Sequence, residues 1–169
     1  IGGNLLIGSP VYLVGYTGNQ SLTSISSLYN LTSIGGDIII DGNASLASLN
    51  GLENVENSSI ENIHIYNNTI MSDCDVQSIC DYLASPNGGV HVYNNAPGCN
   101  NPAEIASACG YNLPCLPYGN YYLKTQADVD SFQFNFPGCT EIEGSVIVRQ
   151  SDITNLNGLM DITSISGDL

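Results

Sequence analysis

The sequence predicts an all-β fold with short helices, a right-handed parallel β-helix stapled by disulfides. Three observations lead to this prediction. Apolar residues recur at every third position in rows that repeat along the chain, short apolar strands are bounded by Gly and Asn, and six cysteines fall within residues 74–139. Self-similarity at a spacing of 20 to 30 residues is typical of a solenoid, in which each turn buries its apolar side chains against the next.

The apolar rows are the strongest pattern. A period of three is neither helical nor a simple strand alternation. The second row begins 24 residues after the first, and a third follows late in the chain. We expect Leu22, Leu46 and Ile153 to occupy equivalent buried positions, and Ile25, Leu49 and Leu156 the next ones. The rows are Leu22, Ile25, Leu28, Leu31 and Ile34 (first row); Leu46, Leu49, Leu52 and Val55 (second row); and Ile153, Leu156, Leu159, Ile162 and Ile165 (third row).

Five short strands are expected beside these rows. Gly and Asn at their ends supply the left-handed backbone conformations that tight corners require. Successive turns would stack them as parallel strands about 4.8 Å apart. The expected strands are Leu5–Ile7, Ile38–Ile40, Ile63–Tyr66, Val90–Tyr93 and Val146–Val148.

Three helices interrupt the strands. Residues 75–83 carry apolar side chains at helical spacing, with Asp73 as the expected N-cap. Asn101 precedes Pro102 and lies three residues before an acid, which is a strong helix start. A third helix is expected to open at Thr125. The segment 110–122 between the last two is rich in Gly and Pro and indicates a domain boundary.

The composition excludes several classes of partner. Lys124 and Arg149 are the only basic residues against 16 acids, which gives a net charge of -14. Nucleic acids and anionic membranes need clustered cations, so neither is an expected partner. Basic partners, divalent cations or simple solubility fit this charge better. No apolar run reaches 18 residues, so membrane insertion of this segment is not expected.

The cysteines indicate disulfides rather than a metal or redox site. No C-x-x-C and no Cys/His spacing of a zinc site occurs. An even, clustered count predicts three disulfides and an oxidising compartment, so we expect a secreted, extracellular or cell-surface protein. We expect no metal and no cofactor.

The phrase "GCTEIEGSVIV" around Cys139 resembles the start of an L domain, the leucine-rich-repeat-like solenoid module of insulin-receptor and epidermal-growth-factor-receptor ectodomains. The phrases "LTSIGGDIII" and "LNGLENV" are similar to those of secreted bacterial proteins that carry this module. The resemblance implies a Cys115–Cys139 disulfide. For the remaining four cysteines we favour Cys74–Cys99 with Cys80–Cys109, which ties each helix to a neighbouring turn, and the other pairings stay open.

The resemblance also implies that the chain contains parts of two domains. Residues 1–113 are expected to be the later turns and helical disulfide cap of one L domain. Residues 114–169 are expected to be the opening cap helix and first turns of a second. Both ends of the sequence fall within a turn, so we expect a segment of a longer, tandem protein. The kinase and transmembrane parts of the receptors are not matched, so signalling is not implied.

One face of the expected sheet is a candidate binding surface. Strand alternation sends the His and Tyr side chains of two equivalent strands outward, next to asparagines, a combination suited to protein or carbohydrate recognition. Two alternatives remain: an Asn ladder that satisfies its own turns, and a solvated His pair. A two-His metal site lacks a carboxylate that the sequence places nearby. The face comprises His64, Tyr66, Asn67, His91, Tyr93 and Asn94.

These features predict a non-catalytic extracellular recognition, adhesion or structural module, not an enzyme. Its partners would be a protein or carbohydrate ligand at the cell surface, or neighbouring copies of itself. Alternatives are a filament-forming surface protein that stacks end to end and, with less support, a β-helix enzyme acting on polysaccharide. The scattered carboxylates, Asp37 and Asp41 among them, are interpreted as solvated corners. Sequons for N-glycosylation on surface turns begin at Asn19, Asn30, Asn43, Asn57 and Asn67.

Overall fold

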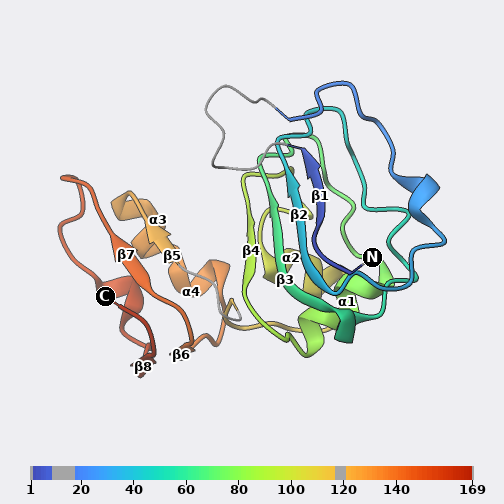
Figure 1. The fold of residues 1–169 in the computed structure, drawn as a ribbon. Coiled ribbons are helices and arrows are strands. Elements are labelled where there is room, and N and C mark those ends of the chain that lie inside the picture. The colour runs from blue at the N-terminus through green and yellow to red at the C-terminus, as the bar shows by residue number, and fades with distance from the viewer. Residues whose placement is uncertain (1, 9–17, 117–120, 169) are drawn as a thin grey trace. The chain divides into compact units, whose positions relative to one another are not determined.

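The chain forms two compact units in a computed structural model that describes residues 2–8, 18–116 and 121–168 (Figure 1). Unit 1 spans Ile1–Tyr111 and unit 2 spans Asn112–Leu169. Both are rich in short strands, which pair in parallel, and both contain short helices. The assignment of the units to successive L domains stays a prediction. Within the described ranges, no helix is long and apolar enough to cross a membrane.

Unit 1 is built on a four-stranded parallel sheet whose strands lie side by side in chain order. The register joins Leu5 to Ile38, Ile38 to Ile63 and Ile63 to Val90, so equivalent residues of successive strands form columns across the sheet. All four expected strands of this unit are present. Their bounds are β1 Leu5–Gly8, β2 Gly36–Asp41, β3 Ile60–Tyr66 and β4 Val90–Tyr93.

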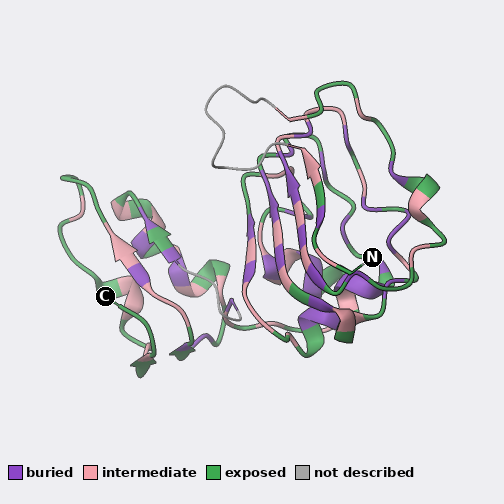
Figure 2. Cartoon of the chain, in the orientation of Figure 1, coloured by how far each residue is buried: buried purple, intermediate pink, exposed green. Residues whose placement is uncertain are grey.

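Alternation along the strands separates a core side from an outer side, as the purple and pink stripes of β2 and β3 show in Figure 2. Ile38, Ile40, Ile63 and Ile65 are fully buried. β-Branched side chains suit this position, because they pack well on a pleated surface. The intervening residues form the outer side.

Left-handed corners close the sheet at its carboxyl edge. Gly18, Gly42, Asn67 and Asn94 all have positive φ, between 55° and 71°. Glycine adopts this conformation freely, and asparagine is among the few other residues that tolerate it. The corner residues are therefore equivalent positions of successive turns of the chain.

The apolar rows of unit 1 lie apart from the sheet, and the second row is the better buried. Leu46, Leu49 and Leu52 are fully buried, whereas Leu22 of the first row is half-buried. Backbone hydrogen bonds join the second row to both of its neighbours: the Leu49 N–H donates to the Asp73 carbonyl at 3.0 Å, and the Glu56 N–H donates to the Thr32 carbonyl at 2.9 Å. The second row is thus enclosed on two sides.

Helices and disulfides lie at the β4 end of unit 1. Helix α1, Gln77–Ala84, packs against α2, Pro102–Ala108, and α2 also contacts β4. The predicted start of α2 is confirmed, because the Asn101 side chain accepts a hydrogen bond from the Glu104 N–H. Disulfides join Cys74 to Cys99 and Cys80 to Cys109, the pairs that the sequence favoured.

The predicted N-cap of α1 is wrong. The helix begins at Gln77, after an extended Val76, and not behind Asp73. Asp73 instead forms a parallel bridge with Ser48, next to the second row. Val76 occupies the N-cap position, and Asp73 lies three residues before it, where its backbone hydrogen-bonds to the second-row residues Ala47 and Leu49.

Unit 2 is smaller and has two pairs of parallel strands. A third disulfide, Cys115–Cys139, lies in this unit, as the resemblance implied. Tyr121, Phe132 and Phe136 form an aromatic cluster in its core, with ring centroids 5.0–5.2 Å apart. The paired strands are β5 Tyr121–Leu123 with β7 Val146–Val148, and β6 Glu141–Ile142 with β8 Ser164–Ile165; the helices are α3 Gln126–Asp130 and α4 Phe132–Asn135.

The helix predicted to open at Thr125 is confirmed as α3. The Thr125 hydroxyl accepts a hydrogen bond from the Asp128 N–H, and the Asp128 carboxylate accepts one from the Thr125 N–H, which completes a capping box. Residues 117–120 of the expected boundary segment lie outside the described residues.

The predicted burial of the third row is only partly correct. Leu156, expected in a buried position equivalent to Leu49, is 42% exposed, and Ile153, Leu159, Ile162 and Ile165 are half-buried. The described residues place a neighbour on one side of this row, where the Thr163 N–H donates to the Thr140 carbonyl at 2.7 Å. Apolar residues at the right spacing stay exposed when no neighbouring turn covers them.

Candidate functional site

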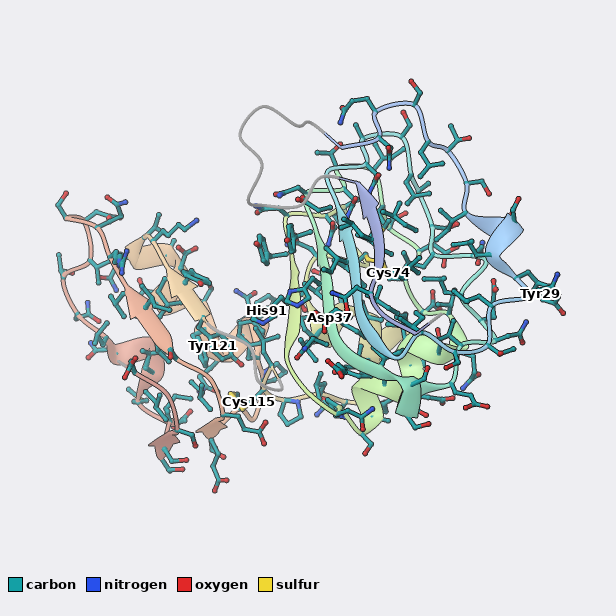
Figure 3. The ribbon with its side chains drawn as sticks, viewed as in Figure 1. Tyr29, Asp37, Cys74, His91, Cys115 and Tyr121 are labelled. Carbon is teal, nitrogen blue, oxygen red and sulfur yellow. A yellow bond between two sulfur atoms is a disulfide. The ribbon has the colours of Figure 1, made fainter. Side chains whose placement is uncertain are left out.

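The outer side of the unit 1 sheet, here called the outer face, presents three columns of side chains. The strand register defines the histidine and tyrosine columns, because residues paired across parallel strands point to the same side, and side-chain hydrogen bonds define the acidic column. Figure 3 labels Asp37 and His91 on the sheet, and labels Tyr29 on the far side of unit 1 from them. The columns are Asn4, Asp37 and Asn62 (acidic column); Leu6, Ile39, His64 and His91 (histidine column); and Gly8, Asp41, Tyr66 and Tyr93 (tyrosine column).

The acidic column is tied together by amide groups. The Asn62 Nδ2 donates to Asp37 Oδ1 at 2.7 Å, and the Asn4 Nδ2 donates to Asp37 Oδ2 at 3.3 Å. Just before the next strand, the Gly89 N–H donates to Asn62 Oδ1 at 2.7 Å. Amide donors thus hold the Asp37 carboxylate in place.

The tyrosine column combines ring stacking with a second carboxylate. The rings of Tyr66 and Tyr93 are parallel, with centroids 4.9 Å apart. Burial raises the pKa of Asp41, and a hydrogen bond from Asn67 Nδ2 at 3.0 Å opposes this effect. Asn94 donates in turn to Asn67 Oδ1 at 3.2 Å. The column is therefore ordered from Asp41 to the corner asparagines.

The histidine column ends in a stacked pair of imidazoles. The ring centroids of His64 and His91 lie 4.8 Å apart with an angle of 5° between the planes. Burial lowers the pKa of both, the nearby Asp37 carboxylate opposes the shift at His64, and His64 lowers the pKa of His91 further. Both imidazoles are consequently held in their neutral form at neutral pH.

The six predicted face residues come from two adjacent strands and their corners, and the structure brings them together. Tyr66 departs from the expectation of an exposed Tyr and Asn surface, since it is only 6% exposed, whereas Tyr93 is 43% exposed. Tyr66 lies in an inner strand between Asp41 and the ring of Tyr93, so its neighbours cover it on both sides. Tyr93 lies in β4, at the end of the sheet.

The asparagine ladder that the sequence offered as an alternative is present, one position after the left-handed corner residues and inside the unit. Asn68 Oδ1 accepts hydrogen bonds from the backbone N–H and Nδ2 of Asn43, both at 3.0 Å, and Asn68 donates to Asn95 Oδ1 at 3.1 Å. The amides of Asn43, Asn68 and Asn95 also donate to strand carbonyls, those of Ile7, Ile40 and Ile65. The available signal was an asparagine directly after each left-handed corner. The ladder residues are Asn19, Asn43, Asn68 and Asn95.

The sequons differ in their accessibility. Asn43 is fully buried in the internal ladder, so its expected place on a surface turn is wrong. The side chains of Asn19, Asn57 and Asn67 each donate a hydrogen bond within unit 1. Asn30 is exposed and its amide has no hydrogen-bond partner among the described residues, which makes it the most accessible acceptor of the five.

A carboxyl pair flanks Cys74 outside the outer face. Partial desolvation raises the pKa of Asp73, and the hydrogen bond and charge of the neighbouring Asp75 carboxyl raise it further. Two carboxyl groups that are hydrogen-bonded to each other retain one shared proton to a higher pH than isolated carboxyl groups do. In the described part of the chain, however, no group of three or more His, Cys, Asp or Glu residues is placed to hold a metal ion.

Comparison with known protein families, with curated proteins and with solved structures found no match to this chain.

Proposed function

We propose that this chain is part of a non-catalytic extracellular recognition module, built as a right-handed parallel β-helix of the L-domain type, that binds a ligand on its outer face. The parallel strands in register, the repeated left-handed corners and the internal asparagine ladder support a solenoid plan. Three disulfides are typical of an oxidising compartment and support an extracellular location.

The observation that carries this proposal is the order of the outer face. Each of two columns contains a stacked pair of rings, and hydrogen bonds fix the side chains of the acidic column and of the corner asparagines. A surface that is rigid before binding loses little conformational entropy on binding. Tyr and His rings add contact area, and Asn and Asp supply hydrogen-bonding groups. Such a surface suits a carbohydrate or protein ligand.

The test is a microarray of purified neutral and acidic polysaccharides and of cell-surface proteins, probed with the chain and two variants. Tyr93→Ala alters the outer face, and Tyr29→Ala removes an exposed tyrosine (59% exposed) elsewhere in unit 1. We expect a bound spot that Tyr93→Ala weakens by roughly tenfold or more, because it removes the most exposed ring of the outer face, and that Tyr29→Ala leaves unchanged. Absence of any bound spot, or equal binding by both variants, would contradict the proposal.

A second candidate function is end-to-end assembly into a filament. The observation that favours it is the exposed third row of unit 2, where Leu156 is 42% exposed and the adjacent Met160 is 75% exposed. A neighbouring copy that stacked on this row would bury these side chains. Sedimentation velocity of the chain and of Leu156→Glu tests this alternative: filaments predict large species that the variant abolishes, and a monomer in both contradicts it.

A further inference from the structure

Three Asn-Gly pairs occur in the chain, and two of them lie in the identical sequence "LNGL". The nitrogen of a glycine is unhindered, because glycine has no Cβ, so it can attack the side-chain Cγ of a preceding asparagine. This attack begins deamidation. The two "LNGL" pairs are alike in local sequence, so a difference in their reactivity comes from the fold. The pairs are Asn50 with Gly51, Asn87 with Gly88, and Asn157 with Gly158.

The pair in the second row of unit 1 is closed to this reaction. Gly51 is buried, and its N–H donates to both carboxylate oxygens of Glu53, at 2.8 and 3.0 Å. The Gly51 nitrogen must leave these oxygens before it can turn towards the Cγ of Asn50. The attack also requires the nitrogen to lose its proton, and the negative charge of the neighbouring carboxylate disfavours that loss.

The other pair of unit 1 is held by hydrogen bonds at both reacting groups. The Gly88 N–H donates to the Tyr82 hydroxyl at 3.0 Å. The Asn87 Nδ2 donates to the carbonyls of Asn57 at 2.9 Å and Ile60 at 3.1 Å. All of these partners lie in other segments of unit 1, so the nitrogen and the side chain are fixed independently of each other.

The pair in the third row of unit 2 lacks both kinds of protection. Asn157 is exposed, and among the described residues neither its side-chain amide nor the Gly158 N–H has a hydrogen-bond partner. The pair opens a single-turn 3₁₀ helix, η3 Asn157–Leu159. Two hydrogen bonds close this turn, from Leu159 N–H to the Leu156 carbonyl and from Met160 N–H to the Asn157 carbonyl. A short exposed turn of this kind opens at a low cost in free energy.

We propose that Asn157 is a site of deamidation, and that the fold of unit 1 protects Asn50 and Asn87 from the same reaction. The Gly158 nitrogen bonds to the Asn157 Cγ and gives its proton to water or hydroxide. The Cγ–Nδ2 bond breaks, and ammonia leaves. Water then adds to one of the two carbonyls of the resulting succinimide, which leaves aspartate or isoaspartate at position 157.

The isoaspartate product disturbs the contact between η3 and helix α3. The Gly158 backbone lies so close to the Val129 carbonyl oxygen that a Cβ atom on Gly158 would collide with it. Isoaspartate adds a methylene to the main chain directly before Gly158, so this close approach is lost. We therefore expect the modified unit 2 to be less stable. The site is independent of the proposed recognition function, and either can fail without the other.

Two variants test the reasons given for this selectivity. Glu53→Ala removes the acceptor of the Gly51 N–H and should speed the reaction at Asn50 several-fold, with Asn157 unchanged; an unchanged rate at Asn50 would contradict the role of Glu53. Asn157→Gln keeps an amide, but its cyclisation needs a less favourable six-membered ring. After long incubation this variant should keep the denaturant unfolding of unit 2, whereas the unmodified chain should lose stability there. Equal losses would contradict the effect of the product on unit 2.

Peptide mapping by mass spectrometry of the intact, disulfide-bonded chain, incubated at mildly alkaline pH, measures all three sites in one sample. We expect Asn157 to react roughly tenfold faster than Asn50 and Asn87, or more. In the reduced chain unfolded in urea, Asn50 and Asn157 should react at equal rates, because both lie in "LNGL". Equal rates at these two residues in the folded chain would overturn the proposal. So would an Asn157 that stays intact in the folded chain while the unfolded chain reacts.

Discussion

The second and third apolar rows follow the same sequence pattern but differ in burial. Leu49 is fully buried, and its counterpart Leu156 is 42% exposed. The second row has hydrogen-bonded neighbours on two sides, whereas the described residues give the third row a neighbour on one side. The period of three therefore specifies the path of the chain, and the neighbouring turns decide how far that path is buried.

The second and third rows share the sequence "LNGL", and in both rows its glycine makes the same kind of close backbone contact. A Cβ atom on Gly51 would collide with the Ile25 carbonyl oxygen, and one on Gly158 would collide with the Val129 carbonyl oxygen. Each row thus needs a glycine where the preceding segment crosses it closely. In unit 1 that segment belongs to the first row, and in unit 2 it belongs to helix α3. The glycine of each row therefore allows a close backbone approach, although the approaching segment differs between the two units.

The largest expected effect is the loss of a buried leucine from the second row. Leu49→Ala should lower the free energy of unfolding of unit 1 by roughly 2–5 kcal/mol, and Leu49→Asp by more, because it buries an unpaired carboxylate. Leu156→Ala should cost unit 2 less than about 1 kcal/mol, since much of that side chain already contacts water. Thermal and denaturant unfolding measure all three.

Ser48→Ala is the control for this comparison. Ser48 lies next to Leu49 and is half-exposed, so its loss should cost less than about 0.5 kcal/mol. If Ser48→Ala were as damaging as Leu49→Ala, the period of three would not define the buried positions.

The next effect concerns the disulfide of unit 2. Cys115 and Cys139 are 24 residues apart, and opening this loop should cost about 3 kcal/mol in the chain-entropy model. Unit 2 has the smaller buried core, so the paired change Cys115→Ser with Cys139→Ser should unfold it while unit 1 stays folded. Near-ultraviolet circular dichroism and limited proteolysis follow the two units, and joint unfolding would contradict their independence.

The internal asparagine ladder gives a third comparison, because only unit 1 has one among the described residues. Asn68→Ala removes the acceptor of the buried Asn43 amides and should cost about 2–3 kcal/mol. Asn30→Ala, at an exposed corner, is the matched control and should be nearly neutral. Similar melting temperatures for the two variants would show that the ladder contributes little.

The sequence predicted the parts of this fold that depend on local pattern. The rows, the strand positions and the helix starts at Asn101 and Thr125 follow from spacing and capping chemistry. The exposure of Leu156, the burial of Tyr66 and the bridge at Asp73 depend on which turns lie alongside, and local pattern does not contain that information.

For the candidate site, too, the sequence predicted which residues share a face but not which side chains surround them. Alternation placed His64 and His91 on one face, and the structure adds the register that brings Asp37 beside them. The internal position of Asn68 was not predicted, because the sequence alone does not distinguish a left-handed corner asparagine from the buried one that follows it.

The smallest expected effect is a pH dependence at Asp41. Burial raises the pKa of this carboxyl above its ordinary value of 3.8, so the folded state binds the proton more tightly than the unfolded state. Asp41 therefore lowers the stability of unit 1 at neutral pH, and this loss is recovered as the pH falls through the raised pKa. Asp41→Asn should stabilise unit 1 at pH 7 and lose this advantage below about pH 4. Urea unfolding from pH 3 to 8 measures this difference, and equal stability of the variant and the unmodified chain at pH 7 would contradict it.

Hydrogen exchange tests the central claim most directly, which is that neighbours on two sides stabilise a row whose local path is already set. The Leu49 amide donates to Asp73, and the Thr163 amide donates to Thr140, so each reports on one contact between a row and its neighbour. Under native conditions we expect the Leu49 amide to exchange roughly 100-fold more slowly than the Thr163 amide, since it opens only with unit 1 as a whole. Equal protection of the two amides, or slower exchange at Thr163, would contradict the account.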